Sequence, residues 1–221
     1  MAHDTSRVTV VDHPLVAHKI TMLRDETTPS SAFRVLCQEV TLLTAYEALR
    51  HLPVHKVPVK TPVAETESPV LSGRAPAIVG ILRAGLVMVE AILTLIPHGR
   101  VGHLGLYRDP DTHQPVEYYR KLPENIDERE VLLVDPMLAT GGSAAHALDI
   151  LADAGVADVA VHGPGVGHER VEQRLEHTDR HRRLQTDRAR RRQDVAHGVE
   201  LRLRHRCRPG LVIGAHRAAL S

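Results

Sequence analysis

The feature that most constrains the fold is an alternation of short apolar runs with longer, helix-like stretches in the middle of the chain. The apolar runs have the length of strands and occupy residues 76–82, 101–107, 130–134 and 156–161. Residues 84–96 and 143–154 have the length and apolar spacing of helices. Continuous apolar runs indicate strands buried on both faces, and helices between them indicate crossover connections. We therefore expect an α/β fold in which a parallel sheet is flanked by helices.

Two further elements are expected before this region. Between residues 29 and 52, apolar side chains recur at three- and four-residue steps, which predicts an amphipathic helix. Residues 53–74 are rich in Pro, Val and Thr, and Val57, Val59 and Val63 stand at alternating positions. This pattern predicts edge strands or an extended arm. We therefore expect an N-terminal helical segment and an extended arm that precede the sheet in the sequence.

Composition indicates a globular protein of ordinary size. The 221 residues are enough for one domain, and the contents of 43% apolar and 25% charged residues are typical of globular chains. No run approaches the roughly 18 apolar residues of a membrane span, and residues 1–7 lack the pattern of a signal peptide. Cys37 and Cys207 form no Cys-x-x-Cys pair, so we expect free thiols. These observations predict a cytoplasmic protein without membrane contact.

The loop at residues 135–143 has the chemistry of a phosphate-binding site. It follows an apolar strand and precedes a helix, whose first backbone N–H groups and dipole attract anions. Its glycines let an anion approach the backbone, and Thr140 and Ser143 add hydroxyl donors. Asp135 would repel a phosphate, so its natural use is to accept hydrogen bonds from sugar hydroxyls. Ligands of parallel sheets bind at the carboxyl ends of the strands, which is where this loop is expected.

This loop resembles the phosphoribosyl diphosphate (PRPP) signature of type I phosphoribosyltransferases, in the Asp-Pro-Met-Leu-Ala-Thr-Gly-Gly-Ser form of the uracil phosphoribosyltransferase family. Other segments resemble the same family in its order and approximate spacing. These segments are residues 13–16, 24–25, 45–48, 81–86, 105–109 and 115–119. The resemblance covers about residues 8–160, and a match of this length in a strand, loop and helix context is specific.

The resemblance implies transfer of ribose 5-phosphate from PRPP to uracil, giving UMP and pyrophosphate, with Mg²⁺ on the PRPP. It places the phosphate on residues 139–143 and the ribose hydroxyls on Asp135, while Pro136 replaces the second acid of other type I enzymes. It assigns Arg83 and Asp135 as catalytic and Arg83 and Arg108 as PRPP-binding. The full PRPP site implied is Arg83, Arg108, Asp135, Pro136, Met137, Leu138, Ala139, Thr140, Gly141, Gly142 and Ser143. The family also suggests a homo-oligomer and GTP as an activator.

Simpler interpretations of these residues stay open. Asp135 could cap the loop that follows it, and Arg83 could be a solvated loop residue. Arg108 could pair with the neighbouring acids Asp109 and Asp111. An alternative from a different functional class is that the protein is a non-catalytic regulator with the same fold. Such a regulator would sense PRPP or a nucleotide, or it would bind RNA.

A zinc site is not predicted, although His-x-x-x-His spacings occur twice. His51 and His55 are interrupted by Pro53, and His177 and His181 lie in an atypical tail. We therefore predict no resident metal.

The chain changes character near residue 161. Every lysine and every aromatic residue lies before it, and beyond it arginine is the only strongly basic side chain. We divide the chain into a phosphoribosyltransferase core at residues 1–160 and an Arg/His-rich tail at residues 161–221. The tail does not resemble the family, and we expect it to be disordered or out of frame. The family's C-terminal loop, which reads the uracil edge, is not recognisable there, so the uracil-binding residues are unassigned.

Three interpretations of the tail remain. Clustered arginines can bind RNA, but the tail lacks the aromatics and fold signatures of nucleic-acid modules, which makes a nucleic-acid partner the weaker expectation. A solvated charged surface is the second. The third, which we favour, is a reading-frame shift near codon 160 in a GC-rich gene. Another frame of the coding DNA would then encode a Pro-Gly-Leu-Gly-Asp loop.

Overall fold

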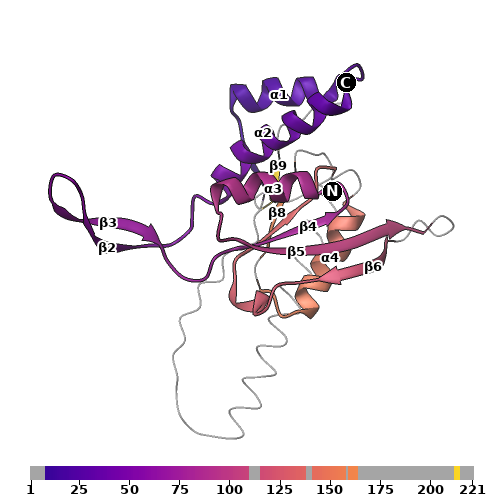
Figure 1. The fold of residues 1–221 in the computed structure, drawn as a ribbon. Helices are drawn as coiled ribbons and strands as arrows, with labels where there is room; N and C mark the ends of the chain where they lie inside the picture. The colour runs from indigo at the N-terminus through magenta and orange to yellow at the C-terminus, as the bar shows by residue number, and fades with distance from the viewer. Residues whose placement is uncertain (1–7, 110–114, 138–140, 158, 164–211, 215–221) are drawn as a thin grey trace, which may run out of the picture.

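The computed structural model describes residues 8–109, 115–137, 141–157, 159–163 and 212–214 (Figure 1). The helices are α1 (Pro14–Arg24), α2 (Ser30–Ala48), α3 (Leu86–Leu95), the short 3₁₀ helix η1 (Ile126–Glu128) and α4 (Gly142–Asp153). The strands are β1 (Val8–Val10), β2 (Val54–Lys60), β3 (Glu65–Leu71), β4 (Ala77–Leu82), β5 (Arg100–Arg108), β6 (Pro115–Lys121), β7 (Val131–Val134), β8 (Val159–His162) and β9 (Val212–Gly214). This arrangement confirms the α/β fold.

The main sheet is mostly parallel. Its strand order is β1-β9-β8-β7-β4-β5-β6, and every pair is parallel except β5 with β6. The pair β5–β6 adds an antiparallel edge to the parallel sheet that the sequence predicted. β6 is antiparallel to β5 because the connection between Arg108 and Pro115 is short: it is long enough for a hairpin and too short for the crossover that a parallel pair needs. The strands β4, β7 and β8 are buried along almost their whole length.

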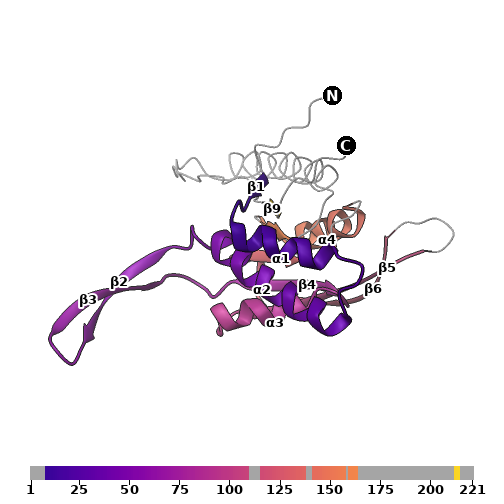
Figure 2. The ribbon, with the colours of Figure 1, turned by 90° about the horizontal axis from the view of Figure 1, so that it is seen from above.

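Helices cover both faces of the sheet, as Figures 1 and 2 show. On β4, Val79 packs toward α4 while its neighbour Ile78 packs toward α2 and α3. On β7, Leu133 and Leu132 divide in the same way. Because successive strand residues point to opposite faces, a strand that is apolar at every position needs cover on both sides. This explains the unbroken apolar runs in the sequence.

The N-terminal helices form a small layer of their own. α1 packs on α2 through a cluster of Val16, Ile20 and Val40. The helix expected over residues 29–52 is α2, but it ends at Ala48. A proline disfavours helical backbone at the residue before it, so Pro53 keeps Leu52 out of a helix, and residues 49–51 form turns. α2 is also the longest helix described, and none of the described helices is both long and apolar enough to span a bilayer.

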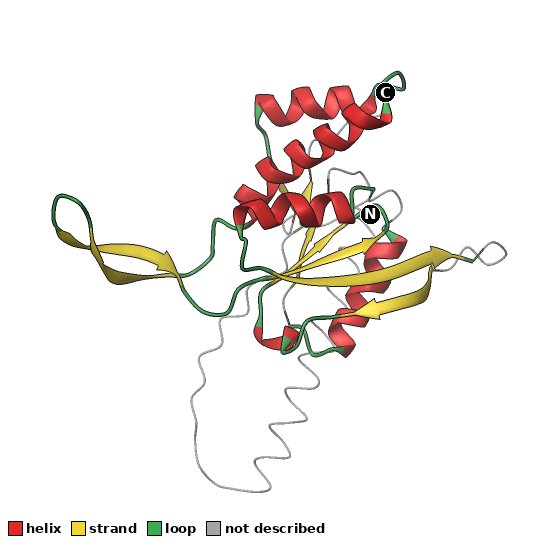
Figure 3. Ribbon diagram, in the orientation of Figure 1, coloured by secondary structure: helices red, strands yellow, loops and turns green. Residues whose placement is uncertain are grey.

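The expected arm is present as the antiparallel pair β2–β3, which forms a separate two-stranded sheet. It projects well away from the main sheet in Figures 1 and 3. Most of its side chains are exposed on both faces.

The sheet continues past the boundary expected at residue 160. β8 runs to His162, and β9 lies between β8 and β1. The division into core and tail stays a prediction.

A buried histidine ends β8 on the face covered by α2. His162 is 1% exposed, and its Nε2 lies 2.9 Å from the hydroxyl of Thr44. That hydroxyl donates to the carbonyl of Val40 at 2.7 Å, so it accepts from the imidazole, which carries its proton on Nε2. Nδ1 has no hydrogen-bond partner among the described residues. Burial lowers the pKa of His162 to about 4, because water no longer solvates the charged ring.

His162 should make folding sensitive to acid. Its pKa is about 4 in the folded chain against 6.5 for an ordinary histidine, so the unfolded chain binds the extra proton between these values. Stability should therefore fall as pH drops from 6.5 toward 4, by up to about 3 kcal/mol. Urea unfolding across this range measures the effect. His162→Leu should flatten the pH slope, whereas replacing the exposed His18 should not; equal slopes in all three proteins would contradict this assignment.

Candidate active site

The carboxyl edge of the sheet brings together the loops that the sequence singled out. Arg83 follows β4, Asp135 follows β7, and Arg108 ends β5. β4 lies between β7 and β5 in the sheet, with Gly80 paired to Val134 and Leu82 paired to Gly105. The three residues therefore lie at the same edge, on adjacent strands, and not on opposite sides of the molecule.

Asp135 is a buried acid at the end of β7. It is 7% exposed, and its Oδ1 accepts a hydrogen bond from the Met137 backbone N–H at 3.1 Å. Its own N–H donates to the His162 carbonyl at 3.1 Å, which ties the ends of β7 and β8 together. Burial raises the pKa of Asp135, and the bond from Met137 opposes this only in part. An acid held at this cost to stability is well suited to a ligand that supplies donors.

The start of α4 offers backbone N–H groups to an anion. Gly141 precedes the helix with φ +70°, a left-handed conformation that glycine adopts without strain. No side chain of the described residues caps the first turn. Gly142 and Ser143 are half-buried there, whereas Leu138, Ala139 and Thr140 lie outside the described residues. Among the described residues, the N-terminus of α4 therefore has no side-chain cap, and it follows the loop that begins at Asp135.

The loop after β4 is held by a glycine that sequence reasoning did not single out for packing. A Cβ on Gly85 would lie 2.8 Å from backbone atoms of Ile81 and Val134. Only glycine fits this approach, and the Gly85 N–H donates to the Ile81 carbonyl at 2.8 Å. The turn is thereby pressed against the ends of β4 and β7. Arg83 is therefore exposed at this edge. It takes part in none of the ion pairs found between described side chains.

The remaining site residues are placed less completely. Pro136 is buried after Asp135, and Met137 is largely exposed. The backbone of Arg108 ends β5, while its side chain and Asp111 lie outside the described part. The pairing of Arg108 with neighbouring acids therefore stays untested.

Metal ligands are not grouped in the part of the chain that the structure describes, where no three His, Cys, Asp or Glu side chains converge. His51 Nε2 pairs with the carboxylate of Glu130, and His55 Nδ1 lies 2.9 Å from the hydroxyl of Ser72. These two histidines are thus engaged elsewhere. His177 and His181 lie outside the described residues.

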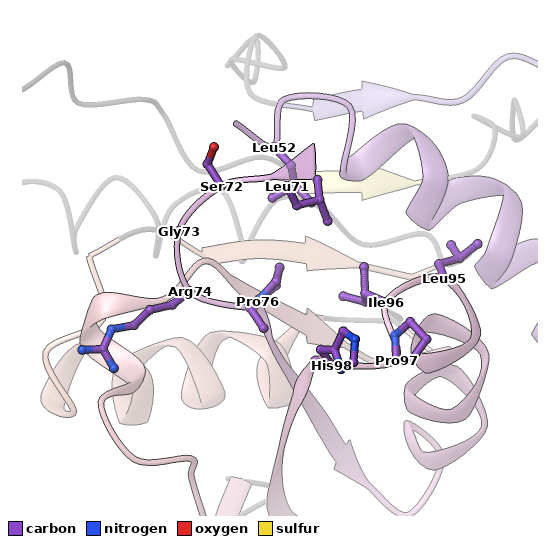
Figure 4. Close-up of a pocket in the computed structure, with 12 residues that line it drawn as sticks. Leu52, Leu71, Ser72, Gly73, Arg74, Pro76, Leu95, Ile96, Pro97 and His98 are labelled. Carbon is purple, nitrogen blue, oxygen red and sulfur yellow. The ribbon is translucent and has the colours of Figure 1, made fainter. Parts of the chain in front are cut away.

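A cavity of about 300 Å³ lies at the opposite edge of the sheet (Figure 4). It is bounded by the base of the arm, the start of β4 and the turn between α3 and β5. Leu52, Leu71, Ile96 and Pro97 give it a mainly apolar lining. It lies at the amino ends of β4 and β5 and is separate from the loops of the candidate site.

Comparison with known proteins agrees with this geometry. The family model described as uracil phosphoribosyltransferase matches residues 10–173. The chain belongs to the uracil phosphoribosyltransferase family. This confirms the resemblance drawn from the loop at residues 135–143. The match ends before residue 174, so much of the Arg-rich tail lies outside it.

Relatives and one solved structure support the assignment. The uracil phosphoribosyltransferase of Thermus thermophilus is 57% identical over 153 residues, covering 69% of this chain and 74% of that protein. The Alkaliphilus metalliredigens protein of the same name is 54% identical over 154 residues, covering 70% and 74%. Among solved structures, the AQ2163 protein from Aquifex aeolicus is similar, with a TM-score of 0.71 and 26% identity over 94% of this chain and 85% of that chain.

Replacing Asp135 separates a binding role from a structural one. Asp135→Asn keeps an acceptor for the Met137 N–H and removes the carboxyl group. Burial raises the pKa of that carboxyl, so its charged form is costly in the folded chain. We expect the variant to be more stable at neutral pH, because the folded state no longer buries an ionised carboxyl, yet to bind PRPP more weakly. Chemical unfolding and calorimetric titration with PRPP measure the two effects. Asp127→Asn, at an exposed acid, is the control; lower stability with unchanged PRPP affinity would make Asp135 a turn-capping residue.

Proposed function

We propose that this chain transfers the 5-phosphoribosyl group of PRPP to uracil, giving UMP and diphosphate, at the carboxyl edge of its sheet. As a member of the uracil phosphoribosyltransferase family it is a PRPP-dependent glycosyltransferase of pyrimidine salvage. The observation that carries the site is the position of a buried acid, Asp135, between the loop of Arg83 and the start of α4, which no described side chain caps.

The proposed binding roles follow from the chemistry of each group. The N-terminal N–H groups of α4, with Thr140 and Ser143, hold the 5-phosphate. Asp135 accepts hydrogen bonds from the ribose hydroxyls, and Pro136 takes the place of a second acid that would add negative charge near the phosphates. One buried carboxylate suits Mg²⁺ poorly as a resident ion but suits a cation carried on substrate phosphates. Mg²⁺ bound to PRPP would neutralise charge on the diphosphate.

The proposed chemistry is a displacement at the anomeric carbon of the ribose. A uracil nitrogen forms the new bond to this carbon, the bond to the diphosphate oxygen breaks with its electron pair, and the proton of the uracil nitrogen leaves to solvent. Negative charge grows on the departing diphosphate. Arg83 and Arg108 stabilise it more in the transition state than in bound PRPP, which is the requirement for faster turnover.

The arm supports a further proposal, that the protein is a homo-oligomer. A two-stranded hairpin alone is marginally stable in water, and this one exposes apolar side chains, with Val63 95% exposed. A second copy of the chain would cover them. GTP activation and a cytoplasmic location are proposed from the family resemblance alone.

The residues that recognise uracil are not assigned, since the family's C-terminal loop is not recognisable in the sequence. Under the proposed reading-frame shift the chain retains the PRPP half of the site and lacks the uracil half. We therefore expect PRPP binding to be weak and transfer to be slow. A non-catalytic PRPP-sensing protein would bind PRPP and form no UMP at all.

Arg83→Ala tests the function. Because Arg83 is exposed and supports no core contact, the variant should fold normally but lose turnover by orders of magnitude. UMP formation from uracil and PRPP, with chemical unfolding of each variant, gives the measurement. Arg100→Ala is a matched control, an exposed arginine at the opposite edge of the same sheet. Wild-type turnover in Arg83→Ala would remove this residue from the site.

A further inference from the structure

The hairpin beside the candidate site contains a β-bulge with a tyrosine at its centre. Gly105 of β5 pairs with Tyr119 of β6, whereas the next residue, Leu106, pairs with Glu117. Tyr118 is therefore an extra residue without a register partner. Bulges bend a strand and re-aim a side chain, and they are common next to active sites.

The bulge directs the ring of Tyr118 across the neighbouring strand. A Cβ on Gly105 would lie 2.7 Å from Cε2 and Cζ of Tyr118, so the ring rests on the bare backbone of this glycine. The Tyr107 ring lies next to it, with centroids 6.2 Å apart and planes inclined by 47°. Within the described residues this is the one pair of aromatic rings found in contact. Tyr107 is 48% and Tyr118 55% exposed, so core packing does not account for the arrangement.

The pair lies over the last part of β5, the strand that ends at Arg108 and pairs with the strand before Arg83. Gly105, under the Tyr118 ring, is the register partner of Leu82, the residue before Arg83. Tyr107 directly precedes Arg108 on β5. Since adjacent strands are about 4.8 Å apart, the glycine under the Tyr118 ring lies beside the end of β4. Three local features, the bulge, the glycine and the ring contact, thus meet at the last residues of β5.

We propose that Tyr118 and Tyr107 form a clasp that fixes the end of β5 and so positions Arg108 beside Arg83 for the diphosphate of PRPP. Tyr118 is a positioning residue in this proposal and acts through Arg108. The inference rests on the proposed function for its effect on PRPP. Its structural half, the fixing of β5, stands without it, because cross-strand ring contacts stabilise a hairpin on their own.

The experiment uses the full chain and measures two quantities. The first is the dissociation constant of PRPP with Mg²⁺, measured by calorimetric titration. The second is the rate of amide hydrogen exchange at residues 105–108 without ligand. The variants are Tyr118→Ala, Tyr107→Ala and Tyr118→Phe, and the control is Tyr119→Ala, an exposed tyrosine on the same strand.

Loss of either ring should raise the PRPP dissociation constant about tenfold and speed exchange at residues 105–108. Tyr118→Phe should restore both values, because the clasp needs the ring and not the hydroxyl. Tyr119→Ala should leave both close to wild type. Unchanged exchange in Tyr118→Ala, or failure of Tyr118→Phe to restore affinity, would overturn the proposal. If the wild type binds no PRPP, the proposed function fails, and the exchange rates alone decide whether the clasp exists.

Discussion

The burial of β4 and β7 between two helical layers is the constraint on which the rest of the structure depends. Ala77, Ile78 and Val79 of β4 are fully buried, as are Leu133 and Val134 of β7. Strands packed this way have no room for polar chemistry along their length, because an unpaired charge there would be strongly destabilising. The polar groups are therefore confined to the strand ends, and the parallel direction gathers them at a single edge.

The carboxyl edge is organised by close backbone approaches more than by side-chain pairs. Gly85 lets the loop of Arg83 press against the ends of β4 and β7, and Gly141 lets the chain enter α4 through a left-handed conformation without strain. Asp135 is held buried by the strand it follows, and its raised pKa reflects the cost of that position. Such local costs are typical of sites arranged for a ligand and not for stability.

The sequence predicted the elements whose periodicity is set by burial, namely α2, α3, α4 and the strands β4, β5, β7 and β8. It missed α1, which buries only Val16 and Ile20 and so has a weak apolar pattern. It also missed β6, whose antiparallel pairing depends on a short connection, and β9, which has three residues. The common edge of Arg83 and Asp135 followed from topology. The ring of Tyr118 over Gly105 and the packing at Gly85 could not be predicted, because they depend on register and tertiary contacts.

The central claim is that PRPP binds at the carboxyl edge between the loop of Arg83 and the start of α4. Amide hydrogen exchange of the full chain, with and without PRPP and Mg²⁺, tests it most directly. The account predicts slower exchange at residues 83–86 and 141–145, which the bound ligand would cover, and no change at residues 72–75 and 98–99 around the apolar cavity. Protection confined to the cavity, with none at the carboxyl edge, would contradict the account.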